Sequence, residues 1–140
     1  MSEASVRRGT WWRNSLLVGV FYFAIGRLFA LPTFNAPLFR WAAWVICFVA
    51  YCAHIWFEHV RLRNAPRMIA LHVSVAVGVG ALLLAVAAMV HNIALKGTAV
   101  VPGWLISLVA WPLLTGIPAF LVTLVGARVL ARRDKPAQHQ

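Results

Sequence analysis

Acidic side chains are almost absent from this chain of 140 residues. Thirteen Lys and Arg stand against three acids, Glu3, Glu58 and Asp134, and the formal net charge is +10. Glu58 is the only acid away from the two ends of the chain. A catalytic pair of carboxylates is therefore excluded, and no nucleophile is seen beside a general base. These absences make an enzyme the least favoured class of function.

Cysteine is also scarce. Cys47 and Cys52 are the only two, and they are five residues apart in one apolar run. At that spacing they point to different sides of a helix, and they do not form a CxxC pair. We expect two free, buried thiols that act as small apolar side chains.

Long polar stretches are missing as well. The chain is 62% hydrophobic, which is more apolar surface than a soluble domain of this length can hide. The positive charge could indicate nucleic-acid binding, but the basic residues lie at the ends of apolar runs and not on one polar face. We therefore expect a lipid bilayer, and no nucleic acid, as the partner of these charges.

Four apolar runs remain once the polar segments are set aside. Each is long enough for a membrane helix, and they predict an all-α, four-helix membrane bundle. The predicted spans are 14–31, 40–58, 68–95 and 104–130. Polar tails are expected at 1–13 and 131–140, and turns at 31–37, 59–67 and 96–103. A cleavable signal peptide is disfavoured because Arg27 and bulky residues occupy the cleavage region.

The distribution of positive charge predicts the orientation. With both termini on the inner side, ten of the 13 Lys and Arg lie there, and three, Arg27, Arg40 and Lys96, lie on the outer side. Cytoplasmic segments carry the excess of Lys and Arg in membrane proteins. We therefore expect both termini and the 59–67 loop in the cytoplasm, and the protein in the inner (plasma) membrane.

Three of the spans carry small or polar residues at alternating spacings of three and four. Such a seam allows close packing between membrane helices. The first span has Ser15, Gly19, Tyr22 and Gly26; the third has Ser74, Gly78, Ala81, Ala85 and Ala88; the fourth has Gly116, Ala119, Thr123 and Gly126. The alternative is chance, because Ala and Gly are common in membrane helices.

The second span carries a stripe of a different kind, here called the polar stripe. Its members follow one another at spacings of 4-3-4-3-4-3: Arg40, Trp44, Cys47, Tyr51, His54, Glu58 and Arg61. Charged groups in lipid are costly, so we expect the stripe to face protein or water, or to snorkel at its ends.

The candidate site lies where this stripe meets the next helix. His54 and Glu58 are one helical turn apart, and His72 falls at a similar depth if the next helix runs antiparallel. We favour a structural role, with Glu58 as the buried partner of Arg61, Arg67 or His72. Three other hypotheses stay open. His54, Glu58 and His72 could bind a divalent metal, His54 and His72 could hold haem b, or the group could relay protons.

Arg27 is a further candidate because the outer half of the chain has no acid to pair with it. It either snorkels or contacts an anion or a lipid headgroup. The function that follows is a non-enzymatic accessory or interaction subunit of a membrane complex, or a self-assembling bundle. The alternative is a binder or carrier that uses the polar stripe for haem b, a divalent metal, protons or a small anion.

Overall fold

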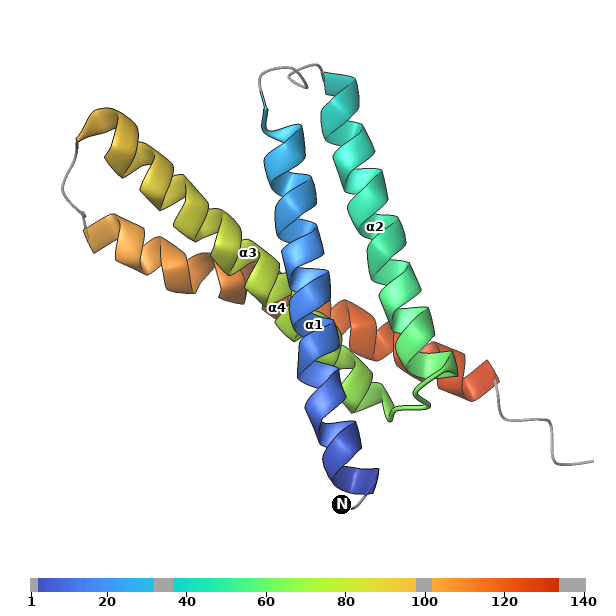
Figure 1. Cartoon of the computed structure of the whole chain (residues 1–140). Coiled ribbons are helices and arrows are strands. Elements are labelled where there is room, and N and C mark those ends of the chain that lie inside the picture. The colour runs from blue at the N-terminus through green and yellow to red at the C-terminus, as the bar shows by residue number, and fades with distance from the viewer. Residues whose placement is uncertain (1–2, 32–36, 98–101, 134–140) are drawn as a thin grey trace, which may run out of the picture.

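Four helices make up this computed structural model, which describes residues 3–31, 37–97 and 102–133 (Figure 1). They are α1 (Glu3–Phe29), α2 (Pro37–Val60), α3 (Pro66–Lys96) and α4 (Pro102–Arg133). The described part of the chain contains no strand, so the predicted all-α, four-helix fold is confirmed.

The helices extend beyond the predicted spans at most of their ends. α1 begins at Glu3, so most of the predicted N-terminal tail is helical, and α4 continues to Arg133. α4 also continues through Pro112 and Pro118, as neighbouring groups allow in membrane helices. The predicted turn at 31–37, the loop at 96–103 and the tail at 131–140 fall largely outside the described residues.

Three of the four helices are long and apolar enough to cross a membrane. They are Pro37–Val60, Pro66–Leu95 and Gly103–Arg133, in α2, α3 and α4. α1 is not among them, because Arg13 and Asn14 at one end and Arg27 at the other shorten its apolar stretch. The structure therefore supports a membrane location with three candidate spans, and the crossing of α1 stays a prediction.

The helices form two hairpins, α1–α2 and α3–α4, which cross each other (Figure 1). α3 lies at the centre and packs extensively against α4 on one side and against α1 on the other. α2 makes far less contact with the other three helices. The basic end of the molecule, defined here as the end with the α2–α3 connection, also carries the start of α1 and the end of α4 (Figure 1).

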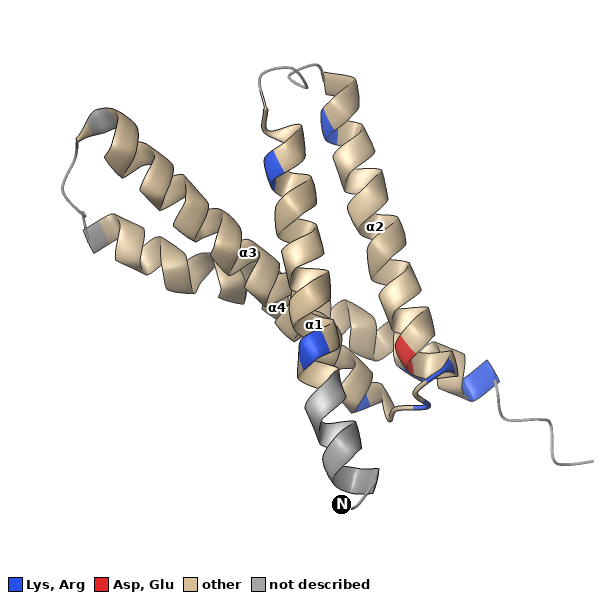
Figure 2. Cartoon of the chain, in the orientation of Figure 1, with Lys and Arg blue, Asp and Glu red and all other residues tan. Residues whose placement is uncertain are grey.

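Most of the described Lys and Arg residues gather at this basic end, as Figure 2 shows, while Arg27 and Arg40 belong to the opposite ends of α1 and α2. The fold thus separates the charges in the way that the predicted topology requires. Which side of the membrane the basic end faces stays a prediction.

The predicted seam of α1 packs directly against α3. A Cβ atom at Gly19 would lie 2.8 Å from Val79 Cγ1 and 2.9 Å from the carbonyl oxygen of Ala76. Gly80 meets α1 equally closely, because a Cβ there would lie 3.0 Å from Tyr22 Cβ. α3 therefore uses Ala76 and Gly80 toward α1, and neither belongs to its predicted seam.

Two members of the predicted seam of α3, Ser74 and Gly78, face α4 instead, whereas its last member, Ala88, is exposed. A Cβ at Gly78 would lie 3.8 Å from the Pro112 carbonyl oxygen, and one at Gly116 would lie 3.5 Å from that of Ser74. In α4, Ala119 and Thr123 are buried as predicted. Gly126 is not part of the contact, because a Cβ there would meet nothing within 4 Å.

Both cysteines are free, as predicted. Cys47 is half-buried, but Cys52 is exposed at the surface of the bundle, so the prediction of a buried thiol is wrong for Cys52. The physical reason is its place on α2. At 100° per residue it lies about 100° around the helix from Tyr51 and about 160° from His54, and therefore away from the buried part of the polar stripe.

The close approach of α1 to α3 predicts opposite effects for two Gly→Ala changes. Gly19→Ala should lower the midpoint of thermal unfolding in detergent, because overpacking a tight contact costs typically about 1–3 kcal/mol. Gly126→Ala is the matched control, since it meets open space and gains up to about 1 kcal/mol of helix propensity. Equal shifts in the two variants would contradict the α1–α3 contact.

Candidate functional site

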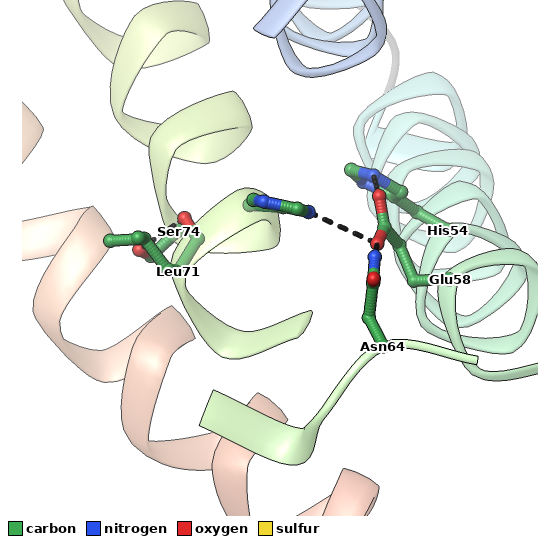
Figure 3. Close-up of polar contacts among 6 residues, drawn as sticks. His54, Glu58, Asn64, Leu71 and Ser74 are labelled. Atoms are coloured by element: carbon green, nitrogen blue, oxygen red, sulfur yellow. Dashed lines mark hydrogen bonds and ion pairs between the residues drawn. The ribbon is translucent and has the colours of Figure 1, made fainter. Parts of the chain in front are cut away.

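The carboxylate of Glu58 is the centre of the polar cluster at the basic end (Figure 3). It lies in the last turn of α2 and is completely buried. Asn64 Nδ2 donates a hydrogen bond of 2.5 Å to Glu58 Oε2, and His72 Nδ1 lies 3.0 Å from the same oxygen. The backbone N–H of Asn64 also donates to the carbonyl oxygen of Glu58 at 3.3 Å. One acid thus joins the end of α2, the connection and the start of α3.

His54 approaches the other oxygen of the carboxylate. Its Nε2 lies 3.7 Å from Glu58 Oε1, which is within reach of an ion pair but too long for a hydrogen bond. His54 and His72 are 7% and 3% exposed, so both imidazoles are buried beside the carboxylate. The carboxylate therefore stands between two rings that come from different helices.

The backbone of the α2–α3 connection places Asn64 beneath Glu58. Arg63 has a φ of 49°, in the left-handed region that non-glycine residues rarely adopt. Ala65 is extended, with φ −61° and ψ 145°, and Pro66 starts α3 with a preset φ. The chain therefore reverses within 61–65 and directs the Asn64 amide toward the end of α2.

Trp11 closes the cluster from the α1 side. Its ring stacks on the His72 imidazole, with centroids 4.8 Å apart and an interplanar angle of 10°. Stacking of this kind fixes the ring plane of His72. Three helices and the connection therefore converge on the same group of side chains.

The structure brings together the three residues that the sequence singled out, His54, Glu58 and His72. His72 is the partner that Glu58 was predicted to have, whereas Arg61 and Arg67 are exposed and do not pair with it. Of the three partners that the sequence offered for Glu58, the structure thus selects His72.

Two members of the site were not predicted. Asn64 lies in the predicted turn at 59–67, where it is the one amide side chain, and this is the signal that could have found it. Trp11 is not predicted because its approach to His72 depends on where α1 crosses α3.

The polar stripe turns inward along part of its length. Glu58 and His54 are buried, and Tyr51 is half-buried. The Tyr51 hydroxyl donates to the Ala119 carbonyl oxygen at 2.9 Å, and it lies 2.6 Å from Thr123 Oγ1, from which it can then accept. Beyond Cys47 the stripe is exposed at Arg40 and Trp44, and it is exposed again at Arg61. Its inward direction is therefore confirmed from Tyr51 to Glu58 and wrong for Trp44.

The arrangement gives no support to the cofactor hypotheses. Among the residues that the structure describes, no three His, Cys, Asp or Glu side chains are placed to hold a metal ion together. Glu58 Oε2 is already bonded to Asn64 and His72. The chemistry that the cluster does support is a hydrogen-bonded clasp between two helices.

Two cavities flank α2. One, here called the groove, has a volume of about 410 Å³ and lies between α1 and α2, with Asn14, Leu17, Ala50, Ala53 and His54 among its lining residues. The other, here called the cleft, has a volume of about 420 Å³ and is lined by all four helices. Tyr22, Trp44, Cys47, Phe48, Tyr51 and Leu84 are among the residues that line the cleft.

Comparison with protein-family models, with curated proteins and with solved structures finds no match to this chain. The interpretation of its function therefore depends on its own geometry.

The hydrogen bonds that Glu58 accepts from Asn64 and His72 predict a large loss of stability when this carboxylate is removed. Glu58→Ala leaves His72 and Asn64 without their partner, at about 1–3 kcal/mol for each buried polar group left unpaired. Arg61→Ala is the matched control, because an exposed side chain away from such contacts usually changes stability by less than about 0.5 kcal/mol. Thermal unfolding in detergent measures both. Equal midpoints of thermal unfolding would show that Glu58 does not hold α2 and α3 together.

The cofactor hypotheses are tested by a visible spectrum and a metal analysis of the protein purified in detergent. If the polar cluster is purely structural, the protein gives neither a Soret band nor stoichiometric metal. A band or a metal that disappears in His54→Ala would overturn the purely structural interpretation.

Proposed function

We propose that this protein is a non-enzymatic interaction subunit of a membrane complex, held in the inner (plasma) membrane with both termini in the cytoplasm. The groove between α1 and α2 receives a transmembrane helix of the partner chain. The observation that carries this proposal is His54. It lines the groove, it is 7% exposed, and neither of its ring nitrogens has a hydrogen-bond partner among the described residues.

An imidazole without a partner is costly in apolar surroundings. Burying a polar group without a hydrogen bond typically costs about 1–3 kcal/mol in proteins. Glu58 Oε1, at 3.7 Å, does not satisfy His54. A hydroxyl or amide side chain on a helix that enters the groove can supply the missing hydrogen bond.

The walls of the groove suit a helix. Membrane helices approach one another at small residues and add hydrogen bonds between polar side chains. α2 offers Ala50 and Ala53 on its side, α1 offers Leu17, and Asn14 adds a second polar group to the lining. The groove therefore combines small side chains, which allow a helix to approach closely, with polar groups that can hydrogen-bond to a specific partner.

The polar cluster itself supports a non-catalytic role. Glu58 is hydrogen-bonded to Asn64 of the α2–α3 connection and to His72 of α3, and Trp11 covers the face of His72. These contacts leave Glu58 as a fixed acceptor and not as a base that faces a substrate.

Photocrosslinking in cells of the native host tests the proposal. A photoreactive amino acid at position 53 should give a discrete adduct, because Ala53 lines the groove. The matched control is position 45, because Val45 is 59% exposed and does not line the groove. His54→Leu should lower the yield at position 53 severalfold, as the loss of an interhelical hydrogen bond of about 1 kcal/mol predicts.

The mass of the adduct identifies the occupant. A second copy of this chain doubles the mass and makes the protein a self-assembling bundle, whereas another mass identifies a different membrane chain. No discrete adduct at position 53, or equal adducts at 53 and 45, would contradict the proposal.

A further inference from the structure

The cleft has the size and lining of a binding site. Its volume of about 420 Å³ lies within the range of about 300–1,000 Å³ that is usual for small-molecule sites. Trp44, Phe48 and Leu84 supply apolar walls, and Tyr22 and Tyr51 supply hydroxyl groups. This combination of a large apolar surface with a few polar groups is typical of ligand sites.

The cleft exists because α2 is attached to the other helices along only one half of its length. Tyr51 bonds to α4, and Tyr51 and Ile55 pack against the buried core of Ile69, Val73 and Ala127. Toward the opposite end α2 stands away from α3 and α4 (Figure 1), and Trp44 is 74% exposed. An opening of this kind within a bilayer is lined by apolar groups and therefore favours hydrocarbon.

Two positive charges stand near the end of the cleft away from the basic end. Arg40 lies one turn before Trp44 on the same face of α2, and Arg27 directly follows Gly26, which lines the cleft. Both arginines are exposed. The sequence has no acid between Glu3 and Glu58 or between Glu58 and Asp134, so no acidic side chain neutralises them at this end. These charges complement an anion at the surface of the bilayer.

The hydroxyl of Tyr22 is an independent observation. It is buried and has no hydrogen-bond partner among the described residues, and Tyr22 lines the cleft. Buried hydroxyls are nearly always hydrogen-bonded, so this one calls for an acceptor from a ligand. Tyr22 lies five residues before Arg27, which is about 7.5 Å along the helix axis. An acceptor at Tyr22 is therefore deeper in the bilayer than an anion at Arg27.

We propose that the cleft binds one anionic phospholipid. Its phosphate lies at Arg40 and Arg27, an ester carbonyl accepts the hydrogen bond of Tyr22, and an acyl chain lies against Trp44 and Phe48. A free phosphate would satisfy the arginines but would leave the apolar walls and the Tyr22 hydroxyl unoccupied. The site is on a different side of α2 from the groove and does not depend on the partner helix.

Lipid photolabelling in nanodiscs tests the site. The full chain is placed in phosphatidylcholine that contains a small share of phosphatidylglycerol with a photoreactive acyl chain. We expect one label per chain, mapped by mass spectrometry to residues of the cleft. Unlabelled phosphatidylglycerol should compete, and phosphatidylcholine should not.

Two kinds of variant distinguish the contact with the lipid headgroup from the fit of the acyl chain in the cleft. Arg40→Gln should lower labelling about fivefold, as expected for one basic residue near anionic headgroups. Arg61→Gln is the control, because it removes an exposed arginine of the same stripe at the basic end. Ala81→Phe fills the cleft and should abolish labelling, whereas Ala88→Phe, on an exposed position of α3 outside the cleft, should not.

Several results would overturn the proposal. They are equal labelling by phosphatidylcholine and phosphatidylglycerol, labels spread over outward positions such as Val45, and full labelling in Arg40→Gln. Complete competition by inorganic phosphate would also overturn it, since the site would then belong to a free anion. If Ala81→Phe does not fold, Arg40→Gln decides alone, because it changes an exposed side chain.

Discussion

The burial of a single carboxylate, Glu58, is the constraint on which the junction between α2 and α3 depends. A buried charge is tolerated when it is paired and hydrogen-bonded, and here the donors come from the connection and from α3. The hydrogen bond from Asn64 depends on the left-handed backbone of Arg63, which directs the Asn64 amide toward Glu58. Glu58 also orients His72, on which Trp11 of α1 then stacks.

α3 explains how so small a bundle is organised. It presents two different faces, with Ala76 and Gly80 toward α1, and Ser74 and Gly78 toward α4. Small residues on both faces let two helices approach it closely. α2 lacks such a contact over much of its length and is held by polar groups and by Tyr51 and Ile55. The two cavities beside α2 are a consequence of this difference.

The sequence predicted the parts that depend on counting along a helix. Spacings of three and four placed Tyr51, His54 and Glu58 on one inward face, and the rise per residue placed His72 at their level. It did not predict the exposure of Trp44, because periodicity identifies a face but not how far a neighbouring helix diverges. Asn64 depends on one unusual backbone angle, and Trp11 on the crossing of α1 over α3. Neither is encoded in a local pattern.

The one-sided attachment of α2 has a mechanical consequence. The groove lies along the attached half, from Ala50 to Phe57, whereas the cleft lies mainly along the free half, from Trp44 to Tyr51. A tilt of the free half about Tyr51 therefore changes the width of the cleft and leaves the walls of the groove in place. Two sites that share no moving element have no coupling free energy, so occupation of one leaves the affinity of the other unchanged.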